Sequence, residues 1–253
     1  MSGRFDYRRF VTNNAFLDRY NEYQTKYTAQ VRESDKLTIG LVREAVNRRN
    51  TSRPARVLDI GCSTGNFLLH LRRAMPDLEL VGGELADSSL EICRRNPDLA
   101  GISFERLDLL DLPPTKDFDI VVVNAVLFMM TDEQFQKSLA SLAGSLAPAG
   151  WLLVFDFFHP FRQKISIMEF SDPHPDGLAL NFRPIPLVTS WLEQHGFDQV
   201  EFRPFTLPID LPRDDDDVGL STYTVFAADG TRLAFRGTLF QPWCHLRALR
   251  CSF

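Results

Sequence analysis

The sequence predicts a doubly wound α/β fold, in which helices cover both faces of a mostly parallel sheet. Strand-like apolar runs alternate with helical patterns five times over residues 55–158. The run at 118–123 is almost continuously apolar, as expected of a strand buried on both faces. Gly61 and Gly65 closely follow the first run, where sheets of this kind turn toward a ligand.

The individual elements follow from local patterns. Residues 1–50 are predicted to be helical, because Tyr20, Tyr23 and Tyr27 share one side of a helix. Thr131 is a predicted N-cap, Gly196 a helix stop, and the Asp229-Gly230 pair a hairpin turn within 221–240. Strands are expected at 55–60, 78–84, 102–108, 118–123, 150–158, 199–207 and 243–249, and further helices at 66–75, 86–96, 131–147 and 186–195. The Phe- and Pro-rich segment 157–188 receives no regular structure beyond these.

We expect a single domain over residues 1–253. Residues 1–50 would form a helical lid and residues 55–200 a cofactor-binding core. Residues 201–253 would supply the last strands together with a β-hairpin insertion.

Composition narrows the function. The net charge of −5 and the pI near 5.6 argue against a nucleic-acid substrate. No run of 18 apolar residues and no leader-like N-terminus is present, so we expect a cytoplasmic protein without a membrane partner. The four cysteines lack zinc spacing, and the acidic run 214–217 lacks the spaced ligands of a calcium loop. No metal site is therefore expected.

Polar residues gather where the predicted strands end, and ligands of an open parallel sheet bind at that edge. The first strand delivers Asp59, Gly61, Ser63 and Gly65. The second delivers Glu84, the third Asp108 and Leu109, and the fourth Asn124.

These residue types favour a nucleoside joined to an amino acid. A carboxylate at Glu84 suits the two hydroxyls of a ribose, and one at Asp108 suits an adenine amino group. Asp59 would repel a pyrophosphate but attract an ammonium group. The glycine spacing also departs from the G-x-G-x-x-G of dinucleotide loops, which argues against an NAD-dependent oxidoreductase.

Five segments carry a resemblance to class I S-adenosylmethionine-dependent methyltransferases of the small-molecule type. They read VLDIGCSTGNF, LVGGELADSSLE, FERLDLLDLP, FDIVVVNAVLFMM and LAPAGWLLVFDF, and they cover residues 55 to about 200 in the family's order. The resemblance implies a seven-stranded sheet with an antiparallel last strand and S-adenosyl-L-methionine as cofactor. It departs from the family at Ser63, which is often glycine, and at Glu84, which is often aspartate.

The resemblance also implies residue roles. Gly61, Ser63 and Gly65 would face the methionine part of the cofactor, near Asp59. Glu84 would bind the ribose, Asp108 and the Leu109 backbone the adenine, and Asn124 would lie near the sulfonium. Tyr27 could contact the methionine carboxylate from a lid helix. Structural alternatives remain open: Asp59 and Asp108 could cap turns, and the tyrosines could pack on the core.

His159, directly after the fifth strand, is the predicted general base, since its ordinary pKa lies near neutrality. A turn histidine before Pro160 is the alternative, and His174 is a second candidate base. Arg162, Arg183 and Arg236 could meet an anionic group of a substrate.

The acceptor is expected to be a small molecule, such as a sugar, a nucleotide-sugar or a natural-product intermediate, methylated on oxygen or nitrogen. The [Asn/Asp/Ser]-Pro-Pro-aromatic motif of nucleic-acid amino methyltransferases is absent after the fourth strand, where Asn124-Ala-Val-Leu stands. A non-catalytic cofactor-binding assembly partner is the main alternative, and a homodimer is left open.

Overall fold

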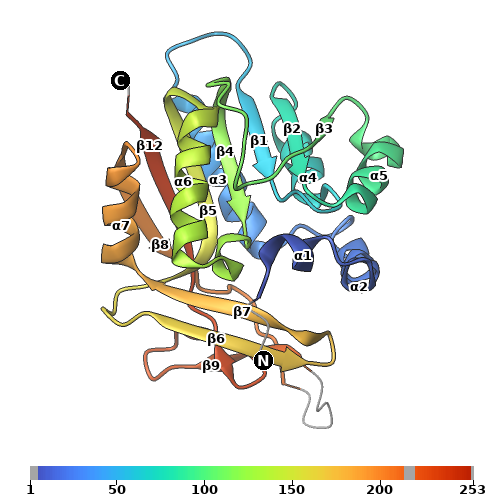
Figure 1. Cartoon of the computed structure of the whole chain (residues 1–253), viewed down its shortest axis with the longest axis vertical. Coiled ribbons are helices and arrows are strands. Elements are labelled where there is room, and N and C mark those ends of the chain that lie inside the picture. The colour runs from blue at the N-terminus through green and yellow to red at the C-terminus, as the bar shows by residue number, and fades with distance from the viewer. Residues whose placement is uncertain (1–4, 214–219, 252–253) are drawn as a thin grey trace.

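A computed structural model describes residues 5–213 and 220–251, and its architecture is the predicted one. A mixed sheet runs in the order β3-β2-β1-β4-β5-β12-β8, and helices cover both of its faces (Figure 1). The first five strands are parallel, whereas β12 is antiparallel to both β5 and β8. The strands are β1 (Arg56–Ile60), β2 (Glu79–Glu84), β3 (Ser103–Arg106), β4 (Phe118–Asn124), β5 (Leu146–His159), β8 (Phe197–Pro204) and β12 (Trp243–Arg250).

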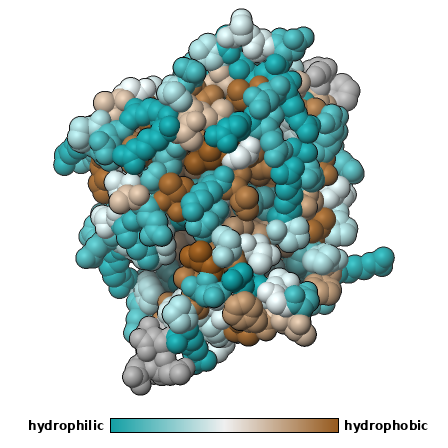
Figure 2. Space-filling view, turned by 180° about the vertical axis from the view of Figure 1, so that it is seen from behind, coloured by the Kyte–Doolittle hydropathy of each residue, from teal (hydrophilic) through white to brown (hydrophobic). Residues whose placement is uncertain are grey.

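The helices divide between the two faces of the sheet. Side chains of α6 and α7 belong to one apolar cluster with the sheet, and those of α3 and α4 belong to another. The helices are α1 (Tyr7–Val11), α2 (Asn14–Thr25), α3 (Glu33–Asn47), α4 (Asn66–Ala74), α5 (Asp87–Arg95), α6 (Asp132–Ser145) and α7 (Ile185–Gln194), with 3-10 turns η1 (Pro97–Leu99) and η2 (Leu127–Met129). The face that α3 covers is largely hydrophilic at its surface, with apolar residues between (Figure 2).

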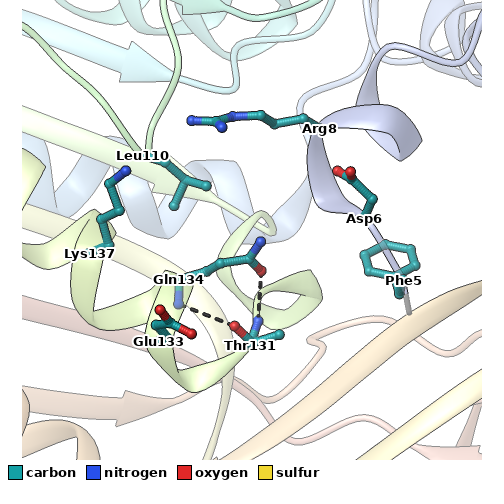
Figure 3. A pocket seen from close by; sticks show the side chains of 8 residues that line it. All are labelled: Phe5, Asp6, Arg8, Leu110, Thr131, Glu133, Gln134 and Lys137. Atoms are coloured by element: carbon teal, nitrogen blue, oxygen red, sulfur yellow. Dashed lines mark hydrogen bonds between the residues drawn. The ribbon is translucent and has the colours of Figure 1, made fainter. Parts of the chain in front are cut away.

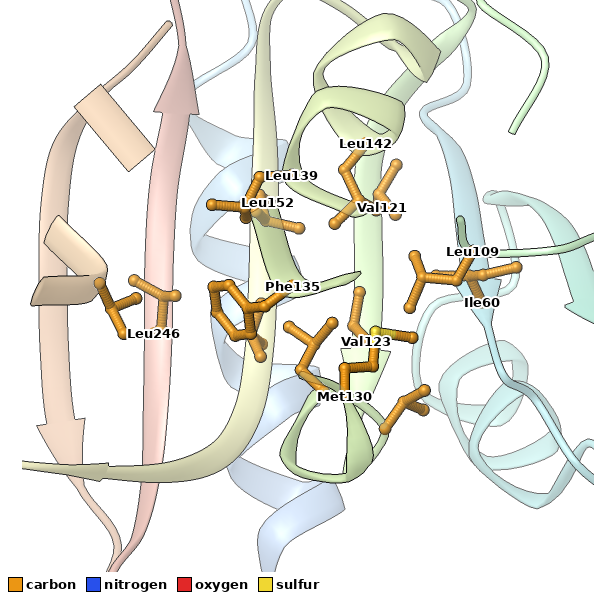
Figure 4. Close-up of a cluster of buried hydrophobic side chains, with 14 of the residues drawn as sticks. Ile60, Leu109, Val121, Val123, Met130, Phe135, Leu139, Leu142, Leu152 and Leu246 are labelled. Carbon is orange, nitrogen blue, oxygen red and sulfur yellow. The ribbon is translucent and has the colours of Figure 1, made fainter. Parts of the chain in front are cut away.

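The larger apolar cluster fixes the sheet against α6 (Figure 4). Phe135, Leu139 and Leu142 project from this helix onto Val121 and Leu152, and all five side chains are fully buried. Burying a large apolar side chain stabilises a fold by about 1.5–3 kcal/mol. This packing holds the carboxyl ends of β4 and β5 in fixed positions.

The start of α6 is also fixed, as the sequence predicts. Thr131 is its N-cap, and its hydroxyl accepts a hydrogen bond from the Gln134 N–H at 3.2 Å. The Gln134 side chain accepts one from the Thr131 N–H at 3.0 Å, which completes a capping box.

Segment 157–188 differs from the expectation, because it contains a β-hairpin. Strand β6 (Ile165–Ser171) pairs antiparallel with β7 (His174–Pro184), whose end pairs with the end of β5. The sequence signal is weak because apolar residues stand on both faces of β6 and no strict alternation results. A separate three-stranded sheet contains the predicted hairpin, formed by β9 (Thr222–Phe226), β10 (Arg232–Arg236) and β11 (Leu239–Phe240).

The N-terminal helices lie between the carboxyl ends of β1, β2 and β4 and the β6–β7 hairpin (Figure 1). Phe10 and Phe16 pack on the ring of His174 at the turn of this hairpin, with centroids 5.7 and 5.5 Å away. Arg19 donates a hydrogen bond to the Pro173 carbonyl at 3.1 Å. The predicted lid is therefore held against the turn of the β6–β7 hairpin. Within the described ranges, no helix combines the length and apolarity needed to cross a membrane.

Candidate cofactor site

The loop after β1 is shaped by left-handed backbone positions. Gly61 and Gly65 have φ of 79° and 77°, and Ser63 between them has φ of 51°. A Cβ on Gly61 would lie 2.7 Å from Cγ2 of Val126, so this position has neither the conformation nor the space for a side chain. The N–H of Gly61 donates to the Gly83 carbonyl at 2.8 Å, which ties the loop to β2.

Glu84 is the buried acid at the end of β2, and backbone groups fix its carboxylate. It accepts hydrogen bonds from the N–H groups of Ser63 (3.0 Å), Leu85 (2.7 Å) and Ala86 (3.1 Å). Burial raises the pKa of Glu84, although the three N–H groups oppose the shift. Its interaction with Ser63 joins the glycine loop to the predicted ribose-binding acid.

Asp59 lies on the sheet face that carries α3, and it belongs to a group of buried charges. Burial is the main reason that the pKa of Asp59 is raised well above its usual range, and Asp35 and Glu84 raise it further. Asp35, in the first turn of α3, is also buried, and its Oδ2 has no hydrogen-bond partner. A guanidinium nitrogen of Arg32 lies 3.7 Å from that oxygen. This group therefore combines three acids with a single arginine.

Sequence reasoning missed Arg32 and Asp35, because they lie in a helical segment without a motif. The signal available was the local sequence Arg32-Glu33-Ser34-Asp35, which reads as an ordinary charged helix start. Only the packing of α3 against the sheet brings Asp35 close to Asp59.

Asp108 follows β3 and is engaged by the lid. Its Oδ1 accepts the Leu110 N–H at 2.9 Å, and its Oδ2 accepts Nε of Arg8 at 2.6 Å. Tyr7 is buried beside this pair. Burial, Glu84 and Asp108 all raise the pKa of the Tyr7 phenol. Helix α1 thus lies over two of the acids that the sequence analysis assigns to the nucleoside.

Asn124 ends β4 opposite Phe155 of β5, and its buried Oδ1 has no hydrogen-bond partner in the part of the chain that the structure describes. The hydroxyl of Ser63 is likewise buried and unpartnered. Leu109 is buried in the large apolar cluster, so only its backbone could meet a ligand. Asn124 and Ser63 are therefore free to bind a group placed between the ends of β1 and β4.

Tyr27 lies at the end of the lid rather than beside the strand-end acids. Its hydroxyl is 2.9 Å from that of Tyr23, and its carbonyl is 2.7 Å from Nε2 of His70. The Arg32 guanidinium stacks 4.0 Å above the Tyr27 ring. The structure thus brings Tyr27 to the charged group around Asp59 through Arg32.

His159 is buried at the far end of β5, where it pairs with Pro184 of β7. Both of its ring nitrogens lack hydrogen-bond partners among residues 5–213 and 220–251. It lies four residues beyond Phe155, the residue opposite Asn124, which corresponds to about 13 Å of extended chain. Among the described residues, no hydrogen bond joins His159 to Asn124.

The other candidate polar residues are engaged within the protein. Burial and the nearby Arg236 lower the pKa of His174 to about 4, and Arg236 also binds Glu169 at 3.2 Å. Arg183 is buried and donates to the carbonyls of Leu127 and Met130. The acidic run 214–217 lies outside the described residues.

A cavity of about 450 Å³ adjoins the Arg8–Asp108 pair. Arg8, Leu110 and Lys137 border it from α1, the loop after β3, and α6 (Figure 3). The remaining lining residues are Phe5, Asp6, Thr131, Glu133 and Gln134. The cavity lies at the predicted adenine end of the site and does not include Asp59 or Asn124.

Comparisons with known proteins agree with this geometry. Residues 57–150 match the family model described as a methyltransferase domain. This region is a methyltransferase domain. The predicted resemblance to methyltransferases is confirmed over this region.

Curated relatives match the chain over part of their length. A demethylmenaquinone methyltransferase of Thermus thermophilus is 35% identical over 121 residues, which cover 47% of this chain and 54% of that protein. A trans-aconitate 2-methyltransferase of Methylobacterium nodulans is 37% identical over 101 residues, covering 40% and 38%. The match thus spans about half or less of these two relatives.

Among solved structures, the fold is similar to 1,6-didemethyltoxoflavin-N1-methyltransferase of Burkholderia thailandensis, solved with bound 1,6-didemethyltoxoflavin and S-adenosylhomocysteine. The TM-score is 0.61 at 13% identity, with 99% of this chain and 93% of that chain covered. At this identity, the similarity is one of fold.

Proposed function

We propose that this chain transfers a methyl group from S-adenosyl-L-methionine to a small organic acceptor. The observation that carries the proposal is the convergence of Asp59, Glu84 and Asp108 at the carboxyl ends of adjacent strands. Glu84 raises the pKa of Asp59, and Glu84 and Asp108 both raise that of Tyr7, so Glu84 lies within electrostatic range of Asp59 and shares Tyr7 as a neighbour with Asp108. A nucleoside attached to a cationic amino acid fits such a surface.

The nucleoside part is assigned to β2 and β3. Glu84 is already oriented by three N–H groups, which leaves about one of its four acceptor positions, on Oε2, for a ribose hydroxyl. Asp108 and the backbone of Leu109 would hold the adenine, once Arg8 releases Asp108. The loop of Gly61, Ser63 and Gly65 would let the backbone come close to the cofactor, and Tyr7 would cover the bound nucleoside.

The methionine part is assigned to the charged group on the α3 face. Its ammonium would add a further positive charge beside Asp59 and Asp35, which now share Arg32, and Arg32 is the cation for its carboxylate. Tyr27, whose ring packs under Arg32, would hold this guanidinium in place. Asn124, with a free buried Oδ1, is assigned to the neighbourhood of the sulfonium.

When bound, the cofactor supplies an activated methyl group for in-line transfer. The protein must then orient the acceptor and exclude water. The clasp of Phe10 and Phe16 on His174 closes the lid over the site for this purpose. His159 is retained as the proposed base for an acceptor that must lose a proton, and its unpartnered ring nitrogens support that role.

Of the expected acceptors, a natural-product intermediate with a flat apolar part is favoured over a sugar or nucleotide-sugar. Phe155, beside Asn124, stacks on Trp243 at 4.7 Å, and Trp243 lies edge-on to Phe128 at 6.4 Å. Trp243 and Phe128 are partly exposed. Aromatic surfaces bind flat apolar groups well.

Calorimetry tests the cofactor assignment. S-adenosylmethionine and S-adenosylhomocysteine should bind the full chain, whereas NAD should not, and Glu84→Ala should abolish binding. Absence of binding by both sulfur ligands would overturn the proposal, and binding of NAD instead would favour an oxidoreductase.

A labelled methyl group tests turnover. The protein should label a component of an extract or of a panel of aromatic natural products, and Asn124→Ala should reduce the rate. Cofactor binding without transfer to any acceptor would favour the assembly-partner alternative. His159→Ala should slow transfer without weakening cofactor binding, with His195→Ala as the matched control. Full turnover by the His159 variant would refute the base assignment.

A further inference from the structure

Strand β6 is an edge strand. It pairs with β7 on one side, and no other described strand pairs with it. Its pairing is regular from Ile165 to Glu169, and the irregularity falls only near the turn, between Glu169 and Ser171. A regular free edge presents unpaired N–H and C=O groups to another strand.

This edge carries little of the usual protection against pairing. Between residues 165 and 171 there is no proline and no lysine, and the single charge, Glu169, is neutralised by Arg236 of β10. Large apolar side chains along the strand and the bend before it, residues 161–170, are 36–70% exposed. They are Phe161, Ile165, Ile167, Met168 and Phe170. Such a strand favours a strand partner with an apolar surface.

The charges at the two ends of β6 are complementary to those of a second, antiparallel copy of the same strand. Arg162 and Lys164 stand before the strand, whereas Asp172 stands after it. Neither Arg162 nor Asp172 forms a side-chain ion pair with any described residue. In an antiparallel pair of two identical strands centred on Ile167, the bend that holds Arg162 of each copy comes to the same end as the turn that holds Asp172 of the other. With the centre at Met168, a register change of two residues, the place of Arg162 is taken by Lys164, which pairs with Asp132 of its own chain.

We propose that β6 is the dimerisation strand of this protein and that its partner is β6 of a second copy, paired antiparallel about a twofold axis. The pairing joins the two β6–β7 hairpins into one continuous sheet. It covers the exposed side chains of Ile167 and Met168, and it forms two symmetry-related ion pairs between the strand ends.

Sedimentation of the full chain over a range of concentrations tests the proposal. We expect a species of twice the 28.9 kDa chain mass. Ile167→Lys should weaken the dimer at least tenfold, because two lysines then face each other across the axis. Phe226→Lys, which changes an exposed apolar residue of β9, is the matched control and should leave the dimer intact.

A charge reversal distinguishes specific strand pairing from nonspecific association of apolar surfaces. Arg162→Asp should weaken the dimer, and the double variant Arg162→Asp with Asp172→Arg should restore it. Both positions are exposed, so these variants fold even where Ile167→Lys does not. A monomer at all concentrations would overturn the proposal, as would a dimer that ignores both Ile167→Lys and the reversal. Cofactor binding measured alongside keeps this result separate from that of the proposed methyl transfer.

Discussion

Arg8 of the first helix binds Asp108, the acid at the end of β3, with 2.6 Å between Nε and Oδ2. The lid thus holds the carboxylate that is assigned to the adenine amino group. Both groups need the same acceptor, so the lid and the nucleoside compete for Asp108. The cavity next to Arg8 leaves room into which its side chain can move.

Arg8→Ala should tighten binding of S-adenosylhomocysteine, because the ligand no longer displaces an ion pair. Arg8 is half exposed, so the pair contributes little, and we expect a decrease in Kd of up to about fivefold. Calorimetry measures this, with Arg9→Ala on the exposed side of α1 as the control. A large loss of affinity would instead mean that Arg8 contacts the ligand.

Glu84→Gln should weaken the same ligand by about 10–100-fold. The amide keeps the size of the side chain but replaces charged hydrogen bonds, which contribute roughly 1.5–3 kcal/mol. It also places an NH₂ group near the N–H of Ser63 or Leu85, which loosens the glycine loop. Glu79→Gln, at the exposed start of the same strand, should leave Kd unchanged. Equal effects of the two variants would contradict the assignment.

Cofactor binding should release protons. Burial raises the pKa of both Asp35 and Asp59, and an arriving ammonium lowers the pKa of each by favouring the charged form. Arg32 and His70 already lower the pKa of Asp35. At Asp59, Glu84 acts in the opposite direction and raises the pKa. Calorimetry near pH 6 in buffers of different ionisation enthalpy measures the number of protons released.

Asp35→Asn should reduce that number and weaken the binding of S-adenosylmethionine. Glu33→Gln, two residues earlier in α3 and paired with Lys36, is the matched control and should change neither quantity. Proton release that is the same in wild type and Asp35→Asn would remove Asp35 from the site.

Much of the fold could be predicted because its strands and caps are local signals. The buried strands β1, β4 and β5 are apolar runs, and the Thr131 cap is a four-residue pattern. The β6–β7 hairpin could not be predicted in this way. Its outer strand is exposed on both faces, so no burial imposes a period of two on its sequence.

The residues of the candidate site also fall into those that the sequence could predict and those that it could not. Glu84 and Asp108 could be found because a strand end is visible in the sequence. Arg8, Arg32 and Asp35 could not, since they reach the site only through the packing of helices against the sheet. A helix face shows which residues are exposed on it, but not which distant carboxylate it will cover.

Asp59→Asn should stabilise the protein in the absence of ligand while it weakens cofactor binding. The folded-state pKa of Asp59 is raised, so its contribution to stability is present below its unfolded pKa near 3.9 and is lost as the pH rises through the folded value. The asparagine does not titrate. The gain in unfolding free energy should therefore be on the order of 1–3 kcal/mol at pH 7–8 and should shrink toward pH 4.

Thermal unfolding at several pH values measures this gain. Asp35 and Glu84 remain, so some pH dependence should persist in the variant. Asp77→Asn, at an exposed position before β2, should shift Tm equally little at every pH. A variant that is less stable than wild type at pH 8 would mean that Asp59 is compensated within the protein. The ammonium-binding role would then lose its physical basis, because a compensated carboxylate has no need of a ligand's charge.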